Sequence, residues 1–215
     1  MIEAVVFDLD GLLIETEEVW DEVREALAHE QGGRWSESAQ RDMMGMSSTE
    51  WSRYMHETVG LVQAPEEIND LVVERMAERY RSQLPLLPGA VEAVERIAAR
   101  WPLGVASSSN RVLIDLVLEL SGLAPRFRAT VSSEEVPRGK PAPDVYLEAA
   151  RRVGVQPTHA SAVEDSSAGI RSASAAGMRV VAIPNRSFPP GEGALEVADV
   201  VLESLAELTP EAIEA

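Results

Sequence analysis

Four carboxylates follow short apolar runs in this sequence, and their types and spacing suit a metal site. Asp8 and Asp10 follow one such run, and Glu164 and Asp165 follow another. Carboxylates this close repel one another, and one of each pair would hold a proton unless a cation neutralised them. Neither histidine nor cysteine is near these residues in the sequence. The set therefore suits a hard cation that keeps bound waters, which means Mg²⁺.

Two further segments have groups that bind phosphate. Hydroxyls and free backbone N–H groups gather at Ser107, Ser108, Ser109 and Asn110, where an apolar run gives way to a helix. Lys140, the only lysine of the sequence, precedes a proline in a loop, where it would bridge an aspartate and a phosphate oxygen. The net charge of −17 repels phosphorylated molecules at long range, so such a site has to be built locally.

Each of these motifs also has a simpler explanation when taken alone. Asp-Leu-Asp-Gly is a common turn after a strand, and Glu-Asp-Ser is a common helix N-cap. Ser and Asn are preferred N-cap residues as well, and a lysine before a proline is usually solvated. Taken together, the motifs favour a binding site, because most of them follow apolar runs that predict strands. Ligands of open α/β sheets bind at strand ends.

The elements that would position these residues alternate between strands and helices. Mainly apolar runs of four or five residues predict buried parallel strands at 4–7, 103–106, 127–131, 160–163, 179–183 and 199–202. Apolar residues at helical spacing predict helices at 90–101, 110–121, 144–153 and 167–176. This alternation is typical of an α/β fold with a Rossmann-like, doubly wound parallel sheet.

About 90 residues separate the first predicted strand from the second, which is far more than a crossover helix needs. Segments 17–30, 36–43, 49–59 and 65–82 all have helical patterns. We therefore predict an inserted, all-helical cap at residues 16–84, and an α/β core formed by residues 1–15 and 85–215.

Composition excludes several functions and partners. The absence of cysteine excludes thiolate catalysis, disulfides and cysteine-bound zinc. His29, His56 and His159 have no metal-ligand spacing, so we expect surface or packing roles for them. An acidic chain does not favour nucleic acid or anionic membranes as partners. No long apolar run or basic leader is present, so the cytoplasm is the expected location.

Four segments, 8–17, 105–110, 139–144 and 163–170, resemble the four motifs of the haloacid dehalogenase-like superfamily. They occur in the family's order and span almost the whole chain. The insertion after the first motif resembles the cap of the subgroup that contains β-phosphoglucomutases, phosphoglycolate phosphatases and sugar phosphatases. Residues 8–20 look closest to hexose- and hexitol-phosphate phosphatases. Glu15 and Leu12 differ from the residues common at their positions, which concerns the cap hinge rather than the chemistry.

The resemblance implies a Mg²⁺-dependent phosphatase that acts on small phosphorylated metabolites such as sugar or polyol phosphates. Asp8 would be the nucleophile that forms an aspartyl-phosphate, and Asp10 the general acid and base, with its main-chain carbonyl on the metal. The implied phosphate-binding residues are Ser107, Ser108, Asn110 and Lys140. The implied metal ligands are Asp8, Asp10, Glu164 and Asp165.

Two alternatives remain open, and the first depends on the cap. A phosphomutase needs a second, cationic phosphate site, and Trp20 and Ser48 stand where β-phosphoglucomutases carry histidine and arginine. Arg41 or Arg53 would have to compensate. A non-catalytic binding protein of the same fold is the other alternative. Substrate selectivity is expected from cap side chains, which equally fit a cap core: Trp20, Met43, Met44, Met46, Trp51 and Tyr54.

Overall fold

The computed structural model describes residues 1–36, 38–44, 46–191 and 193–214. Six parallel strands form one sheet in the order β3-β2-β1-β4-β5-β6. Their bounds are β1 Ala4–Phe7, β2 Leu103–Ser107, β3 Phe127–Ser132, β4 Ala160–Glu164, β5 Arg179–Ala182 and β6 Val200–Val201. The order reverses at β1, which lies between β2 and β4. The predicted doubly wound parallel sheet is confirmed.

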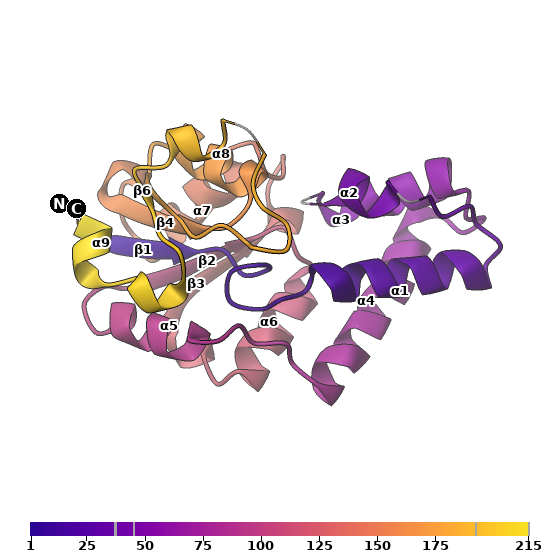
Figure 1. The fold of residues 1–215 in the computed structure, drawn as a ribbon, viewed down its shortest axis with the longest axis horizontal. Coiled ribbons are helices and arrows are strands. Elements are labelled where there is room, and N and C mark those ends of the chain that lie inside the picture. Colours follow the sequence, from indigo (N-terminus) through magenta and orange to yellow (C-terminus); the bar gives the residue numbers. More distant parts are fainter. Residues whose placement is uncertain (37, 45, 192, 215) are drawn as a thin grey trace.

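Helices cover both faces of this sheet (Figure 1). Alternate residues of β1 explain the two layers, since Val5 and Phe7 pack on one face and Val6 on the other. The first face is covered by α5 (Ala90–Ala98), α6 (Arg111–Leu120) and α9 (Pro210–Glu214). The second face is covered by α7 (Asp144–Val153) and α8 (Ser167–Ala175). Short 3₁₀ helices lie at Ala124–Arg126, Ser133–Glu135, Pro157–His159, Leu195–Val197 and Leu205–Glu207.

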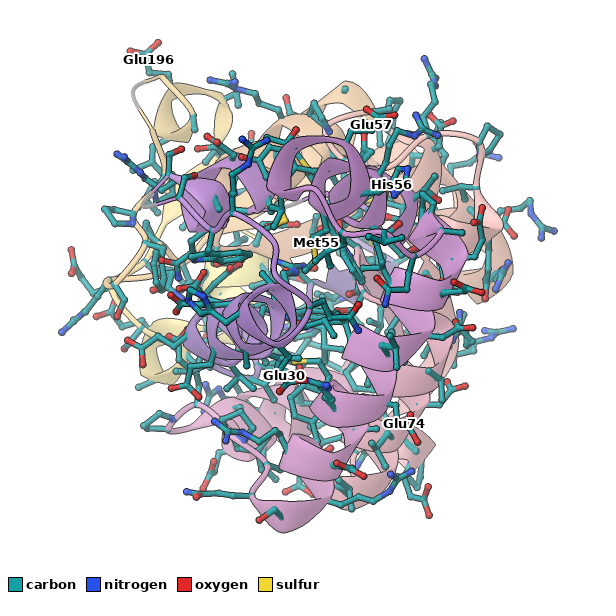
Figure 2. The ribbon with its side chains drawn as sticks, turned by 90° about the vertical axis from the view of Figure 1, so that its right-hand side faces the viewer. Glu30, Met55, His56, Glu57, Glu74 and Glu196 are labelled. Atoms are coloured by element: carbon teal, nitrogen blue, oxygen red, sulfur yellow. The ribbon has the colours of Figure 1, made fainter. Side chains whose placement is uncertain are left out.

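The long insertion is helical, as predicted, and lies beyond the end of the sheet (Figure 1). Its helices are α1 (Glu17–Glu30), α2 (Ala39–Met43), α3 (Ser48–Tyr54) and α4 (Pro65–Ser82). The segment predicted as one helix over 49–59 is α3 followed by a π-helical turn, Met55–Val59. Figure 2 looks onto this end of the molecule, with Met55 turned inward and Glu57 outward. The predicted start of α2 at Ser36 is three residues early, and residue 37 lies outside the described residues.

Two chain crossings join the insertion to the sheet, and they lie against each other. Ile14 and Leu86 form an antiparallel bridge. The N–H of Glu15 donates to the carbonyl of Pro85 at 2.8 Å, and the N–H of Leu87 donates to the carbonyl of Leu13 at 3.0 Å. Because the two crossings are hydrogen-bonded to each other, they form a hinge in which few backbone torsion angles can change. We propose that the chain divides here, into a core of residues 1–15 and 85–215 and a cap of residues 16–84.

Among the described residues, no helix is both long enough and apolar enough to cross a membrane.

Candidate active site

A cavity of about 260 Å³ lies between the core and the cap. The core contributes side chains from the carboxyl ends of its strands, where ligands of open α/β sheets bind. From the core come Asp8, Asp10, Ser108, Ser109, Lys140 and Asp165. The cap contributes Trp20, Arg24, Arg41, Met43, Met44, Met46 and Trp51. Two sets of residues predicted from the sequence therefore line one cavity. They are the polar residues at the strand ends and most of the candidate selectivity residues of the cap.

Lys140 is buried between two carboxylates. Its Nζ lies 2.6 Å from Asp8 Oδ1 and 2.6 Å from Glu164 Oε1, and its side chain is only 4% exposed. Burial lowers the pKa of Lys140, but the carboxylates of Asp8 and Glu164 outweigh burial and raise it above its ordinary value. The lysine is therefore charged, and it holds two strand ends, β1 and β4, at a fixed separation.

Both carboxylate oxygens of Glu164 accept hydrogen bonds from other groups of the protein. Its Oε1 accepts from Lys140 and from the hydroxyl of Tyr146 at 2.7 Å. Its Oε2 accepts from the backbone N–H groups of Asp165 and Ser166, at 3.1 and 3.2 Å. A Cβ on Gly169 would overlap this carboxylate, so α8 packs this closely only with glycine there. Glu164 therefore orients Lys140 and the loop after β4.

The carboxylates of Asp8, Glu164 and Asp165 form one buried cluster, with an oxygen of each within 4.8 Å of the others. Burial, reinforced by Glu164 and opposed by Lys140, raises the pKa of Asp8 to about 8. Burial, Glu164 and Asp8 also raise the pKa of Asp165 well above its usual range. One lysine thus leaves part of the negative charge of three carboxylates uncompensated.

This cluster fits a divalent cation. Asp165 Oδ1 is buried and accepts no hydrogen bond from any described residue, which is costly unless another ligand binds it. Gly11 adopts a φ of +82°, and a Cβ there would overlap Oδ2 of the same carboxylate, so the turn after β1 is shaped around Asp165. Oxygen ligands of this kind suit Mg²⁺ with several waters. Three of the four predicted metal carboxylates, those of Asp8, Glu164 and Asp165, lie together.

The Asp10 side chain, the fourth, lies outside that cluster. Oδ1 accepts from Thr16 Oγ1 at 2.9 Å and faces the indole nitrogen of Trp20 at 3.5 Å. Oδ2 accepts from the hydroxyls of Ser109 at 2.7 Å and Ser107 at 3.1 Å. These donors hold the Asp10 carboxylate in the cavity wall, on the side that the cap covers. Only its main-chain carbonyl remains for the metal role that we expected.

The predicted phosphate-binding residues divide into two groups. Ser107, Ser108 and Lys140 lie at the cavity or against its wall, with Ser107 held by the Asp10 carboxylate. Asn110 is different, because its side-chain nitrogen donates to Asn69 at 2.9 Å and to Glu134 at 2.7 Å. Asn110 does not line the cavity, so the structure does not place it where a phosphate binder is expected. Its backbone position at the start of α6 turns the side chain toward the cap instead.

The three histidines lie where their spacing predicted, away from the cavity. His29 contacts Glu25 on the outside of α1, and His159 contacts Glu3. His56 lies 2.9 Å from the carbonyl oxygens of Leu61 and Gln63, so it packs a turn of the cap.

Sequence reasoning missed Arg24, Thr16 and Tyr146. Arg24 lies on the buried face of α1 together with Trp20 and Leu27, at helical spacing. A charged residue on an otherwise apolar helix face was the signal that could have revealed it. Thr16 and Tyr146 carried no such signal, since a threonine before a helix is an ordinary cap and a tyrosine in an apolar run is ordinary core.

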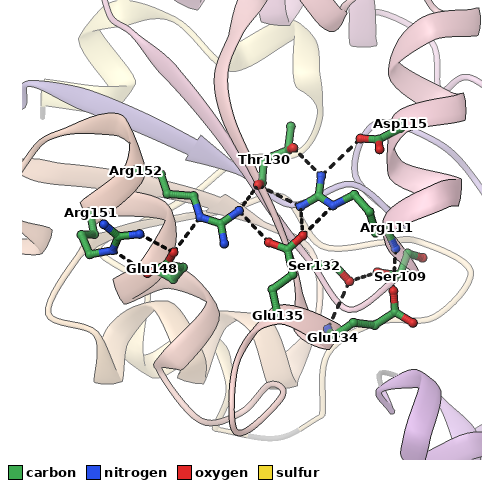
Figure 3. A network of polar contacts seen from close by, with 10 residues as sticks. All are labelled: Ser109, Arg111, Asp115, Thr130, Ser132, Glu134, Glu135, Glu148, Arg151 and Arg152. Atoms are coloured by element: carbon green, nitrogen blue, oxygen red, sulfur yellow. Dashed lines mark hydrogen bonds and ion pairs between the residues drawn. The ribbon is translucent and has the colours of Figure 1, made fainter.

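A seam of polar contacts joins the core to the cap beside the cavity. Glu134, on the core, accepts from Ser48 of α3 at 3.2 Å and from Asn110. Asn110 also donates to Asn69 of α4. The adjacent Glu135 has only core partners, the guanidinium groups of Arg111 and Arg152. Figure 3 shows the two glutamates pointing in different directions from one short helix. The seam therefore holds the cap closed at the start of α6.

We expect Glu134→Ala to open the cap without unfolding the core. Losing these two part-buried hydrogen bonds should shift the closed-to-open equilibrium by about fivefold. Opening uncovers Trp20 and Trp51, which are 6% and 2% exposed in the closed form, so acrylamide should quench tryptophan fluorescence more strongly. Glu135→Ala is the matched control and should lower the thermal midpoint without this change. Equal quenching of the wild type and both variants would contradict a role of the seam in closure.

Carboxylates, hydroxyls and a lysine at the ends of parallel strands are the arrangement of an α/β enzyme that handles anionic groups. The sequence model of the protein family described as haloacid dehalogenase-like hydrolase matches residues 5–183 of this chain. The chain belongs to this family, as its four motifs indicated.

Individual relatives agree with this assignment. The chain is 33% identical to hexitol phosphatase B of Escherichia coli K12, over 97% of this chain and 95% of that protein. The crystal structure of CbbY from Rhodobacter sphaeroides in complex with phosphate is 27% identical and superposes with a TM-score of 0.88, covering all of both chains. The β-phosphoglucomutase of Clostridium difficile, 23% identical, superposes with a TM-score of 0.84 over 100% of this chain and 96% of that one, and so shares the fold.

Proposed function

We propose that this protein is a Mg²⁺-dependent phosphatase that hydrolyses small phosphorylated metabolites, namely sugar or polyol phosphates. The observation that carries the proposal is the Asp8 carboxylate, which lies in the cavity with its Oδ1 2.6 Å from a buried, charged lysine. The chain contains no cysteine, and the three histidines lie elsewhere. Asp8 is therefore the group best placed to attack phosphorus.

The reaction would run in two displacements. Asp8 attacks the phosphorus atom, the bond to the sugar oxygen breaks, and Asp10 gives a proton to that leaving oxygen. Water then attacks the aspartyl-phosphate, Asp10 takes the proton of that water, and inorganic phosphate leaves. Lys140 would offset charge on the transferring group, and Ser108 would donate a hydrogen bond to its oxygens. Ser107 would do the same only by releasing Asp10, to which its single hydroxyl proton is donated.

The residues that would hold Mg²⁺ are Asp8 and Asp165, with the main-chain carbonyl of Asp10. Glu164, which we predicted as a ligand, already accepts hydrogen bonds on both oxygens and would act by orienting Lys140. When bound, the cation neutralises negative charge at the transferring group and in the carboxylate cluster. The uncompensated charge of Asp8 and Asp165 supports this assignment.

The cavity supports a small substrate. A volume of about 260 Å³ suits a molecule of sugar-phosphate size, and the cap closes the cavity against larger ones. The likeness to hexitol phosphatase B, over nearly the full length of both proteins, supports polyol phosphates in particular. A small phosphorylated metabolite is accordingly the partner that we propose.

A phosphomutase is the second candidate, and one observation favours it. The sequence offered no clear cation in the cap, but the structure places Arg24 and Arg41 at the cavity. Arg53, the other compensating residue considered, is exposed and lines a different hollow. A second cationic site is what a bisphosphate intermediate would need, so the experiment has to separate the two activities.

The test is to incubate the enzyme with sorbitol 6-phosphate, and separately with β-glucose 1-phosphate plus a trace of glucose 1,6-bisphosphate. Free phosphate and glucose 6-phosphate are both followed, with Mg²⁺ and with EDTA. We expect phosphate release from sorbitol 6-phosphate that requires Mg²⁺. Rapid formation of glucose 6-phosphate with little free phosphate would establish the mutase, and release that persists in EDTA would exclude the metal.

Asp10→Asn should damage turnover rather than binding. The amide keeps the shape of the side chain, and its one oxygen can still accept from either Thr16 or Ser109, but it cannot give or take the proton. We expect kcat to fall by roughly 10²- to 10⁴-fold while KM changes little. Steady-state kinetics on the best substrate measures both. A change confined to KM would mean that Asp10 binds substrate and transfers no proton.

A further inference from the structure

Arg24 is a buried cation with no hydrogen-bond acceptor or ion-pair partner among the described residues. The residue is 6% exposed, and its guanidinium lies between two indole rings, 4.6 Å from the ring centre of Trp20 and 4.8 Å from that of Trp51. It forms no hydrogen bond or ion pair with any residue in the described part of the chain, and its Nε is buried with no acceptor. It lines the cavity opposite the carboxylates of the core.

Burying a guanidinium group without an anionic partner is costly in free energy unless a ligand supplies that partner. Buried guanidinium groups are normally paired with carboxylates, because removing a charge from water without a partner costs several kcal/mol. Stacking on Trp20 and Trp51 offsets part of that cost and fixes the plane of the guanidinium. It leaves the edge, which carries the N–H donors, free to bind. An oxyanion of carboxylate or phosphate geometry matches that edge.

The acidic neighbours of Arg24 do not replace such a ligand. Glu17 and Asp21 attract the guanidinium, yet neither lies within ion-pair distance of it. Burial, together with Asp10, raises the pKa of Glu17 to about 7, so this carboxyl is partly protonated at neutral pH. Burial lowers the pKa of Arg24 to about 10, which leaves the guanidinium charged. A positive charge therefore faces the cavity.

We propose that Arg24 binds a second anionic group of the substrate, a carboxylate or a second phosphate, at the end away from the phosphoryl group that is transferred. Arg41 lines the same cavity from α2 and adds positive charge on that side. The proposal deepens the proposed phosphatase activity and rests on it. A neutral polyol end would gain little from a desolvated guanidinium, whereas an anionic end would be selected by it.

Three open-chain, six-carbon substrates test this selection. Sorbitol 6-phosphate has a neutral hydroxymethyl group at C1, 6-phosphogluconate has a carboxylate there, and sorbitol 1,6-bisphosphate has a phosphate. We expect the wild type to prefer one or both anionic substrates in kcat/KM by about tenfold or more. The preferred member identifies the anion as carboxylate or phosphate. A preference for sorbitol 6-phosphate would overturn the proposal.

Arg24→Met removes the charge and keeps an apolar chain between the two indoles. We expect it to lower kcat/KM for the preferred anionic substrate by roughly 10- to 100-fold more than for sorbitol 6-phosphate. Arg53→Met is the matched control, since that arginine is in the cap but exposed and outside the cavity. An equal loss on all three substrates would show that Arg24 only supports the fold and would overturn the proposal.

A binding measurement keeps the two proposals separable. If the wild type released phosphate from none of the substrates, the proposed function would fail by itself. Calorimetric titration of wild type and Arg24→Met with 6-phosphogluconate, sorbitol 6-phosphate and sorbitol 1,6-bisphosphate would still test Arg24. Tighter binding of an anionic compound that is lost in the variant supports the second-anion site. Equal affinities in the two proteins overturn it.

Discussion

Replacing Asp8 with asparagine should reduce phosphate release by roughly 10³-fold or more, because an amide cannot form the aspartyl-phosphate. The fold should survive, since the amide would keep an oxygen for Lys140, which now lies 2.6 Å from Asp8 Oδ1. Steady-state turnover on the best substrate measures the loss. A variant of proven purity that keeps near wild-type turnover would disprove covalent catalysis by Asp8.

The same variant should be more stable than the wild type in EDTA at high pH. Burial raises the pKa of Asp8 to about 8, whereas an unfolded aspartate titrates near about 3.9. A carboxyl whose pKa is raised on folding favours the folded state below the unfolded pKa, and this contribution is lost as pH rises toward about 8. An amide has no such loss. We therefore expect the variant's gain in thermal midpoint to be larger at pH 9 than at pH 5.

Asp115→Asn is the matched control for that comparison. Asp115 is an exposed aspartate on α6 whose only partner in the described chain is Arg111. Its replacement should leave turnover and the pH dependence of the thermal midpoint unchanged. If the change in thermal midpoint of Asp8→Asn equalled that of Asp115→Asn at both pH values, charge repulsion within the carboxylate cluster would not destabilise the folded state.

Lys140→Met should lower both activity and stability. The methionine leaves the buried carboxylates of Asp8 and Glu164 without their cation. Breaking a buried ion pair on one side costs about 3 kcal/mol or more. For a chain of this size that is a fall in thermal midpoint on the order of 10 °C. Differential scanning calorimetry in EDTA measures it.

Two conditions should restore stability to Lys140→Met if charge is the cause. Mg²⁺ would neutralise the same carboxylates, and pH 5 would protonate those whose pKa is raised, so the deficit should shrink under either condition. Arg138→Met is the control, because Arg138 lies two residues away in the same loop but pairs with Asp144 at the surface. A deficit that is the same with Mg²⁺, at pH 5 and in EDTA at pH 8 would point to lost packing.

Much of the fold could be predicted because local patterns and tertiary environment agree. The runs at 4–7 and 160–163 are apolar throughout or nearly so and end in acidic residues, and they form the central strands β1 and β4. Helices α1 and α4 have the predicted bounds, the second because Pro65 occupies its first turn. The π-helical turn after α3 could not be foreseen, because its sequence, Met55–Val59, has an ordinary helical pattern.

The site was less predictable where a residue's role depends on packing between distant segments. The proximity of Asp8, Lys140 and Asp165 could be predicted, because their motifs end strands or precede a helix. Asn110 was expected at the phosphate because serines precede it, but a hydrogen-bond partner 41 positions away, Asn69, decides where its side chain points. Arg24 is covered by Trp20 of its own helix and by Trp51 of α3, and no local sequence pattern fixes the contact with α3.

The central place of β1 in the sheet also sets the order in which this protein can fold. Val5 pairs with Leu103 on one side and Val6 with Ala162 on the other, so the strand that precedes Asp8 is made first but lacks its second neighbour until β4 is made. At a ribosomal rate of about 10 residues per second, it waits on the order of ten seconds for both neighbours. The helices at 17–82 contact one another over shorter sequence separations and can assemble during that interval. A nascent chain would therefore carry a structured cap while the apolar residues of β1 are still open to chaperones or to misassociation.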